Sequence, residues 1–153
     1  MKINPDCIRD VMLVLEEKLS FRESTAEGFE GFLFWGSVRV DKLVELMSET
    51  CYSKFDIVYS ALQLSESKYI VTDVGKLYDE GDRLFFKENI LYITPKGHEF
   101  IASIHDKETW GRKISPILQQ IGSVSLSVIE SVSKGIADAA IEKLVKNFPA
   151  DML

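Results

Sequence analysis

The sequence predicts an α+β protein, mostly helical, and three observations lead to this class. Apolar residues recur at three- and four-residue spacing in several stretches, which is typical of amphipathic helices. Two β-branched stretches, 69–74 and 90–93, flank a charged segment with two glycines, as in a β-hairpin. The order helix, helix, strand, turn, strand, helix indicates a winged helix-turn-helix core with a β-hairpin wing and a C-terminal helical extension.

The 153 residues are enough for one domain with its own core. We expect residues 1–106 to form the winged-helix core and residues 107–148 to form helices that pack on it or on a second subunit. No apolar run reaches the roughly 18 residues of a membrane-spanning helix, and the first residues lack a signal-like apolar segment. A cytoplasmic protein without a membrane partner is therefore expected. Cys7 and Cys51 lie in no redox or metal-binding motif and are expected to be small buried side chains in a reducing compartment, with a redox pair or metal ligands as the alternative.

The net charge of −6 is concentrated in the first half of the chain. Residues 1–66 carry 7 basic and 12 acidic residues, a net of −5, whereas residues 67–104 carry 5 and 6, a net of −1. Duplex DNA is bound chiefly through its phosphates. The acidic core therefore argues against strong nonspecific DNA binding, although it leaves room for a small basic patch.

The first predicted helix begins at Pro5, with Asn4 as its N-cap, and places Ile8, Val11 and Leu15 on one apolar face. Residues 20–30 are polar, contain Gly28 and are predicted to form a loop. The aromatic segment 31–40 is predicted to be a short strand that pairs with the wing hairpin. Its aromatic side chains are expected to pack in the core or the sheet, with a ligand or partner surface as the alternative: Phe32, Phe34 and Trp35.

Asp41 is expected to cap a second helix, and Ser53 a third, with Asp56 in the capping-box position. The third helix has an apolar face and an opposite polar face, the pattern of a helix that enters the major groove of DNA. The candidate reading residues on this helix are Lys54, Tyr59, Ser60 and Gln63. The candidate phosphate contacts of the wing are Lys76, Arg83 and Lys87.

Thr94 and Pro95 open a fourth helix, whose inner face is predicted to contain Phe100, Ile101 and Ile104. Pro116 marks the first turn of a further helix, and Gly122 marks its end. The last helix, about 123–146, keeps apolar residues at helical spacing over some six turns. Because it lies outside the minimal core, its apolar face is expected to pack on the core or to form a homodimer.

His98, Glu99 and His105 are the obvious candidates for chemistry. The seven-residue spacing of the two histidines separates them by about 10 Å on a helix, which does not suit a metal pair. No nucleophile motif and no phosphate-binding motif accompanies them. We therefore expect no enzyme, no metal and no cofactor, with an acid–base pair of His98 and Glu99 as the alternative.

Three stretches of the chain resemble a family of uncharacterised bacterial and phage proteins, the domain of unknown function 2513. The stretches are residues 1–19, ALQLSESKYI and LYITPKGHEFIASIHDKETW. Family members typically open with NPDLIRDILLxLE and carry LTxxGHEFLxxIRxxxxW after a wing. His105 stands where the family usually has Arg, and Lys68 stands where a Gly commonly closes the third helix. The resemblance implies a winged-helix fold and a mobile-element origin, and it implies no chemistry.

The matching motif also has a structural explanation in its own residues. Gly97 would allow close packing in the first turn of the fourth helix, and His98 and Glu99 would tie that helix to a neighbour by hydrogen bonds. Phe100 and Trp110 would belong to one apolar seam. Maintenance of the fold accounts for all five residues without a site.

Two functions from different classes remain. A DNA-binding transcriptional regulator is favoured, because double-stranded DNA is the commonest partner of this fold. The alternative is a protein-binding adaptor or inhibitor that occupies a host protein and binds no DNA. The acidic composition, the aromatic stretch 29–35 and the long extra helix favour this alternative.

Overall fold

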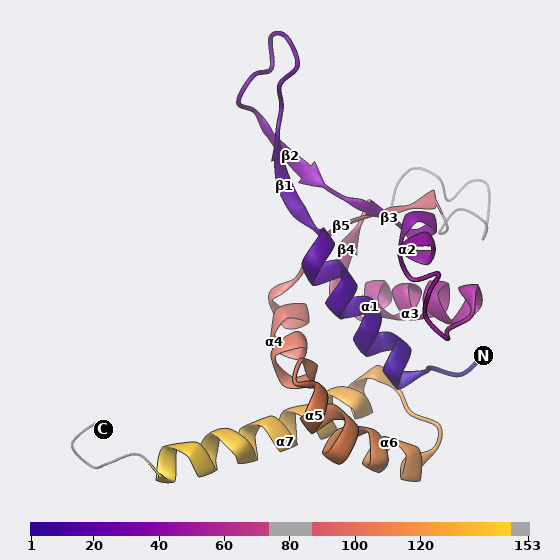
Figure 1. Cartoon of the computed structure of the whole chain (residues 1–153), viewed down its shortest axis with the longest axis vertical. Coiled ribbons are helices and arrows are strands. Elements are labelled where there is room, and N and C mark those ends of the chain that lie inside the picture. Colours follow the sequence, from indigo (N-terminus) through magenta and orange to yellow (C-terminus); the bar gives the residue numbers. More distant parts are fainter. Residues whose placement is uncertain (74–86, 148–153) are drawn as a thin grey trace.

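The structure is a computed structural model of the whole chain and describes residues 1–73 and 87–147. Helices form the body of the molecule, and the β1–β2 hairpin and the end of α7 project from it in different directions (Figure 1). The predicted α+β class with a high helix content is confirmed. The predicted hairpin tip falls outside the described residues.

The elements have the following bounds in chain order: α1 (Pro5–Lys18), β1 (Ser20–Glu23), β2 (Leu33–Gly36), β3 (Val38–Arg39), α2 (Val40–Leu46), α3 (Lys54–Glu66), β4 (Ile70–Thr72), β5 (Asn89–Ile93), α4 (Pro95–Ile104), α5 (Lys107–Thr109), the π-helical turn η3 (Trp110–Ile114), α6 (Ser115–Ile121) and α7 (Leu126–Lys146). Within the described residues no helix is long and apolar enough to cross a membrane.

Two antiparallel sheets organise the strands. In the three-stranded sheet the order is β3-β5-β4, so β5 lies in the middle, with Val38 opposite Ile90 and Ile70 opposite Ile93. The predicted pairing of segment 31–40 with the later hairpin is therefore confirmed for Val38 and Arg39. Residues 33–36 pair with β1 instead.

The β1–β2 hairpin corrects two expectations. Ser20–Glu23 is a strand, where the polar sequence predicted a loop. Phe32, Phe34 and Trp35 are exposed, where the aromatic composition predicted core or sheet packing. The reason for both is the same: these residues form a two-stranded ribbon that leaves the body, so neither of its faces is covered by a helix (Figure 1).

Three of the predicted helix caps are confirmed. The Asn4 side chain accepts the Cys7 N–H at 3.2 Å, the Ser53 hydroxyl accepts the Asp56 N–H at 3.1 Å, and the Thr94 hydroxyl accepts the Gly97 N–H at 3.0 Å. Each bond satisfies a backbone donor that the first turn leaves unpaired.

Asp41 is not the cap of α2, because that helix begins one residue earlier, after Arg39. The Asp41 carboxylate lies in the first turn and pairs with the Arg39 guanidinium at 2.7 Å and with Lys87 Nζ at 3.1 Å. These cations, the Arg39 hydrogen bond first, lower the pKa of Asp41 to about 2. The ion pair with Asp41 holds Lys87 against the start of α2.

α3 ends in a Schellman motif that has lysine in the position normally taken by glycine. The Tyr69 N–H donates to the Leu64 carbonyl at 3.0 Å, and the Lys68 N–H donates to the Ser65 carbonyl at 3.1 Å. Lys68 therefore adopts a φ of 69°, in the left-handed region that a Cβ atom disfavours. The sequence departure at Lys68 thus falls on a residue under backbone strain.

Replacing this lysine should stabilise the protein. Lys68→Gly is expected to raise the free energy of unfolding by about 0.5–1 kcal/mol, because glycine adopts the left-handed conformation without a steric penalty. Urea denaturation followed by far-UV circular dichroism measures the change. Lys68→Ala is the matched control, because it removes the same side chain but keeps the Cβ atom. Equal stabilisation by both variants would show that backbone strain is not the cause.

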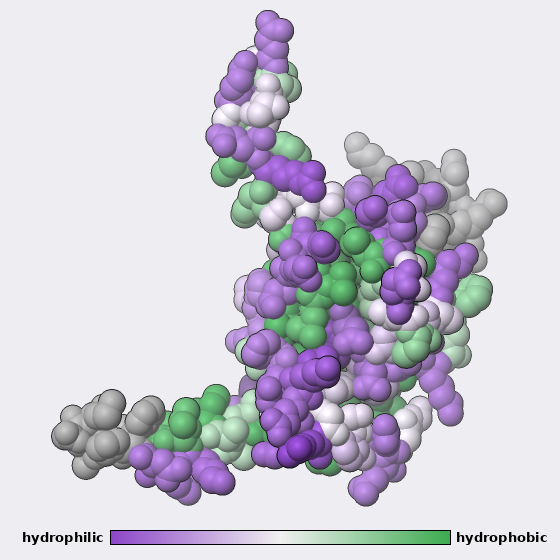
Figure 2. Space-filling view, viewed as in Figure 1, coloured by the Kyte–Doolittle hydropathy of each residue, from purple (hydrophilic) through white to green (hydrophobic). Residues whose placement is uncertain are grey.

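The C-terminal helices join the body through a few specific contacts. The Trp110 indole N–H donates to Asp6 Oδ1 at 2.7 Å, which joins η3 to α1. The Ser103 hydroxyl donates to Ser133 at 3.1 Å, which joins α4 to α7. α7 begins at Leu126 after the N-cap Ser125, and Gly122, with a φ of 87°, ends the helix before it as predicted. The second half of α7 leaves the body, and its apolar side chains are exposed (Figures 1 and 2).

Candidate functional site

The outer face of α3 presents three of the four predicted reading residues but little positive charge. The exposed and half-buried residues of this face mix apolar and polar side chains: Lys54, Phe55, Asp56, Tyr59, Leu62, Gln63 and Glu66. Lys54 is exposed and lies 5.8 Å from the Phe55 ring centroid. Tyr59 and Gln63 are half-buried. Asp56 offsets the charge of Lys54 at the start of the helix.

The prediction that Ser60 lies on the outer face of α3 is wrong. Its residue is 2% exposed, because it follows Ile57 by three residues and precedes Leu64 by four, both of which face the core. Its hydroxyl is next to Cys7, whose thiol pKa burial raises to about 11. Ser60 therefore belongs to the contact between α3 and α1.

Of the three predicted phosphate contacts of the wing, only Lys87 lies in the described part of the chain. Lys76 and Arg83 lie outside the described part of the chain. Lys87 lies just before β5 and pairs with the Asp41 carboxylate, which offsets its charge. The described cations therefore make no continuous positive strip along α3 and the start of β5.

Exposed aromatic side chains gather instead on the β1–β2 hairpin. Three rings stack in series from the hairpin onto the three-stranded sheet. Phe21 and Trp35 have ring centroids 4.7 Å apart, and Trp35 and Tyr92 have centroids 4.9 Å apart. We call these three residues the aromatic ladder. At the far end of the hairpin, Phe29 and Phe32 lie against each other with centroids 6.0 Å apart.

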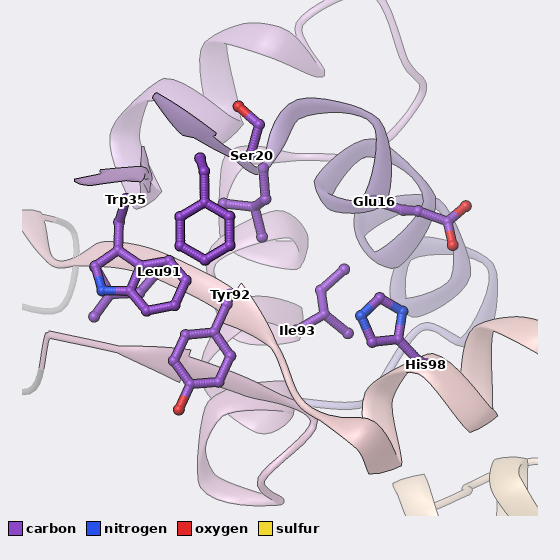
Figure 3. Close-up of a pocket in the computed structure, with 9 residues that line it drawn as sticks. Glu16, Ser20, Trp35, Leu91, Tyr92, Ile93 and His98 are labelled. Carbon is purple, nitrogen blue, oxygen red and sulfur yellow. The ribbon is translucent and has the colours of Figure 1, made fainter. Parts of the chain in front are cut away.

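A pocket of about 380 Å³ lies where the aromatic ladder meets α1 and α4. Its lining is mostly apolar, with polar groups at the side that faces α4. Figure 3 shows Trp35 and Tyr92 on one side of the pocket and Glu16 and His98 on the other, with Ile93 between them. The full lining is Glu16, Leu19, Ser20, Phe21, Trp35, Leu91, Tyr92, Ile93 and His98.

His98 and Glu99 do not act on one site. His98 lines the pocket beside the aromatic ladder, whereas Glu99 lines a groove between α4 and α7. Neighbouring residues on a helix point in different directions, so these two side chains are not placed as an acid–base pair. The expected hydrogen bonds of their side chains are not among those of the described residues. Nor do the described residues include a group of three side chains that could hold a metal ion.

The rest of the sequence motif holds the fold together. A Cβ atom on Gly97 would overlap the Tyr69 carbonyl oxygen and lie 2.6 Å from Ile93 Cγ2, so the predicted close packing is confirmed. Phe100 and Trp110 are buried in the core as predicted. Tyr69, which carries the closely approached carbonyl, also donates its hydroxyl hydrogen bond to Glu130 of α7. Burial and this bond raise the pKa of the Tyr69 hydroxyl.

The sequence does not predict the pocket, because its walls come from five separate elements: α1, β1, β2, β5 and α4. Phe21, Trp35, Tyr92 and His98 lie far apart in sequence, and Tyr92 has the pattern of an ordinary strand residue. The available signal was the pair of aromatic segments around Phe21 and Phe34 on either side of Gly28, which fits a hairpin.

A family model described as hypothetical protein (DUF2513) matches residues 2–124. The match includes every element up to α6 and ends before α7. No curated protein and no solved structure matches the chain.

Proposed function

Because the chain belongs to the DUF2513 family, whose description names no activity, we propose a function from its geometry: it is a winged-helix protein that binds another protein through the β1–β2 hairpin. The observation that carries the proposal is the exposure of the hairpin's aromatic side chains. Phe29 is 63% exposed and Phe32 is 62% exposed, and Leu33 and Phe34 are exposed beside them. Contiguous exposed apolar residues of this kind mark interaction sites.

The winged-helix part of the proposal is supported by the order of the elements. α1, β3, α2, α3, β4 and β5 follow one another, and the sheet order β3-β5-β4 pairs the early strand with the strand that returns after residue 86. In this scheme the β1–β2 hairpin is an addition between the first helix and the first strand. We likewise propose that residues 1–106 form the winged-helix core and that residues 107–148 form helices that pack on it or on a second subunit.

A protein partner fits the described surface better than DNA does. The outer face of α3, which would enter a DNA groove, carries two acids, Asp56 and Glu66, and one lysine, Lys54. A DNA-binding face needs cations that neutralise phosphates. We further propose that the partner belongs to a host cell, since the resemblance in sequence implies a mobile-element origin.

Two hairpin substitutions test the proposal. Immobilised wild-type protein is expected to retain one host protein reproducibly, and the double variant Phe29→Ser/Phe32→Ser is expected to lose it. Phe55→Ser on α3 is the control, because Phe55 is 69% exposed and its loss removes an aromatic side chain of similar exposure elsewhere. The retained protein is then purified and its affinity for all three chains measured. Loss of binding with Phe55→Ser but not with the hairpin variant would contradict the proposal.

DNA binding stays the second candidate, because the proposed fold is most often used for it. In that case Lys54, Tyr59 and Gln63 of α3, with Lys87, would face the duplex. Fluorescence anisotropy at low salt on a random duplex and on the DNA upstream of the gene separates the two candidates. The protein-binding proposal predicts no saturable binding to either. Submicromolar binding that weakens steeply with salt would favour DNA.

A homodimer through the last helix also stays a prediction. The second half of α7 exposes Ile141, Leu144 and Val145. Figure 2 shows hydrophobic side chains along this projecting end. This apolar stripe continues the face that Leu126 and Ile129 bury against the body.

A further inference from the structure

We infer that the pocket beside the aromatic ladder binds a cationic side chain, of arginine or lysine, on a partner segment that adds as a strand to the free edge of β1. This inference rests on the proposed protein-binding function and names the chemistry that the partner must carry. Three observations support it: the stacked rings, the acidic surroundings and the unpaired strand edge.

The aromatic ladder provides faces that attract a cation. Phe21 and Tyr92 stack on Trp35, so the faces open to a cation are those of Phe21 and Tyr92 that point away from Trp35, and Trp35 holds these two rings in place. A guanidinium or ammonium group near an aromatic face is attracted by the negative charge of that face. The apolar residues Leu19 and Ile93 suit the methylene stem of the same side chain.

The charge around the pocket selects a cation over an anion. Glu16 lines the pocket from α1, and its carboxylate has no ion pair among the described residues. Residues 16–36, which run from this carboxylate through the whole hairpin, carry five acidic and two basic residues, a net of −3. The same charge disfavours single-stranded nucleic acid, which otherwise stacks its bases on such rings, because it would repel the phosphates.

The partner segment would pair with the free edge of β1. β1 pairs with β2 alone among the described strands. Phe21 and Trp35 lie directly opposite each other with their rings in contact, and the Ser24 N–H donates to the Phe32 carbonyl at 2.8 Å. The alternation of an antiparallel pair then directs the backbone groups of Phe21 and Glu23 away from β2.

An added strand would bond to these backbone groups. Every second side chain of that strand would then lie on the face of Phe21, above the pocket and near Glu23. This is the recognition mode in which main-chain bonds supply affinity and alternate side chains supply specificity. A cationic side chain at one such position would contact the aromatic rings and lie near the carboxylates of Glu16 and Glu23.

Selection from a displayed library of random 12-residue peptides on the full chain tests the inference. The enriched peptides are expected to contain Arg or Lys among β-prone residues. Synthetic copies are then titrated by fluorescence anisotropy against the wild-type protein and its variants. Changing the peptide's Arg to Gln, or methylating its alternate backbone nitrogens, is expected to weaken binding about tenfold or more.

Variants of the protein locate the site. Trp35→Ala is expected to weaken binding about tenfold and Glu16→Gln about threefold to tenfold, whereas Glu17→Gln should change it less than about twofold. Glu17 is the matched control, because it is the neighbouring acid and does not line the pocket. Enrichment of uncharged or acidic peptides, the absence of enrichment, or equal binding by Trp35→Ala would overturn the inference.

The two proposals fail in different ways. In one outcome, the double variant Phe29→Ser/Phe32→Ser fails to retain the host protein while the selected peptides bind the Glu16 and Trp35 variants as tightly as the wild type. In that case the protein-binding function stands and the cation site is wrong. If neither the host protein nor the peptides depend on the hairpin, both proposals are wrong.

Discussion

Gly97→Ala is expected to lower the free energy of unfolding by roughly 2–4 kcal/mol. The added methyl group would overlap the Tyr69 carbonyl oxygen and press on Ile93 Cγ2 at 2.6 Å. That carbonyl cannot retreat easily, because it accepts hydrogen bonds from the Thr94 N–H at 3.0 Å and from the Thr94 hydroxyl at 3.1 Å. The substitution therefore separates the start of α4 from the end of α3, or breaks those bonds.

The matched control for this prediction is Gly135→Ala. Gly135 also lies inside a helix, but a Cβ atom there has no neighbour within 4 Å. The control should stabilise the protein by up to about 1 kcal/mol, because alanine is the better helix former. Urea denaturation of both variants gives the comparison. A loss of stability below about 1 kcal/mol for Gly97→Ala would show that the close packing at α4 is not needed.

Trp110→Ala is expected to cost about 3–5 kcal/mol, as large-to-small substitutions of buried aromatic residues do. Trp110 is 5% exposed. Its indole N–H donates to Asp6 Oδ1 at 2.7 Å, and the Arg9 guanidinium lies 5.7 Å from the ring centroid. The substitution leaves a cavity and removes a hydrogen-bond donor from the Asp6 carboxylate.

Trp35→Ala is the matched control for the buried tryptophan. Trp35 is 42% exposed on the hairpin, so its removal should cost less than about 1.5 kcal/mol. Unfolding is followed by far-UV circular dichroism, because each variant loses a fluorophore. Similar losses in the two variants would contradict the assignment of Trp110 to the core and of Trp35 to a free surface.

Local signals in the sequence predicted most of the body. The caps at Asn4, Ser53 and Thr94 and the break at Gly122 depend on residues within a few positions of each other, so short stretches specify them. The apolar positions Phe100, Ile101 and Ile104 are buried as their spacing predicts.

The errors came from residues whose surroundings are set by distant parts of the chain. Ser60 looked like an outward polar residue, but it lies between inward positions of α3 and next to Cys7 of α1. Asp41 looked like a cap, but α2 begins one residue earlier, and the Asp41 carboxylate pairs with Arg39 and, across 46 positions of sequence, with Lys87. The contacts with Cys7 and Lys87 leave no trace in the local pattern, whereas the spacing of Ser60 from Ile57 and Leu64 already indicates burial.

The candidate site was the least predictable part. Aromatic density in segment 31–40 predicted burial, because aromatic residues are buried more often than not. The same residues form an exposed ribbon here, since Leu33–Gly36 pairs with Ser20–Glu23 and leaves the body. The pocket then depends on Tyr92 and His98, which arrive from β5 and α4. The alternative of a partner surface, weighed at the outset, is the one that the exposure favours.

Photo-crosslinking in living cells tests the protein-binding account most directly. The photoreactive amino acid p-benzoylphenylalanine is placed at Phe32 in one chain and at Tyr59 in another, since both positions already hold an aromatic ring. The account predicts that Phe32 yields one protein adduct on irradiation and that Tyr59 yields no DNA adduct. Crosslinks to DNA from Tyr59, with none to protein from Phe32, would contradict it.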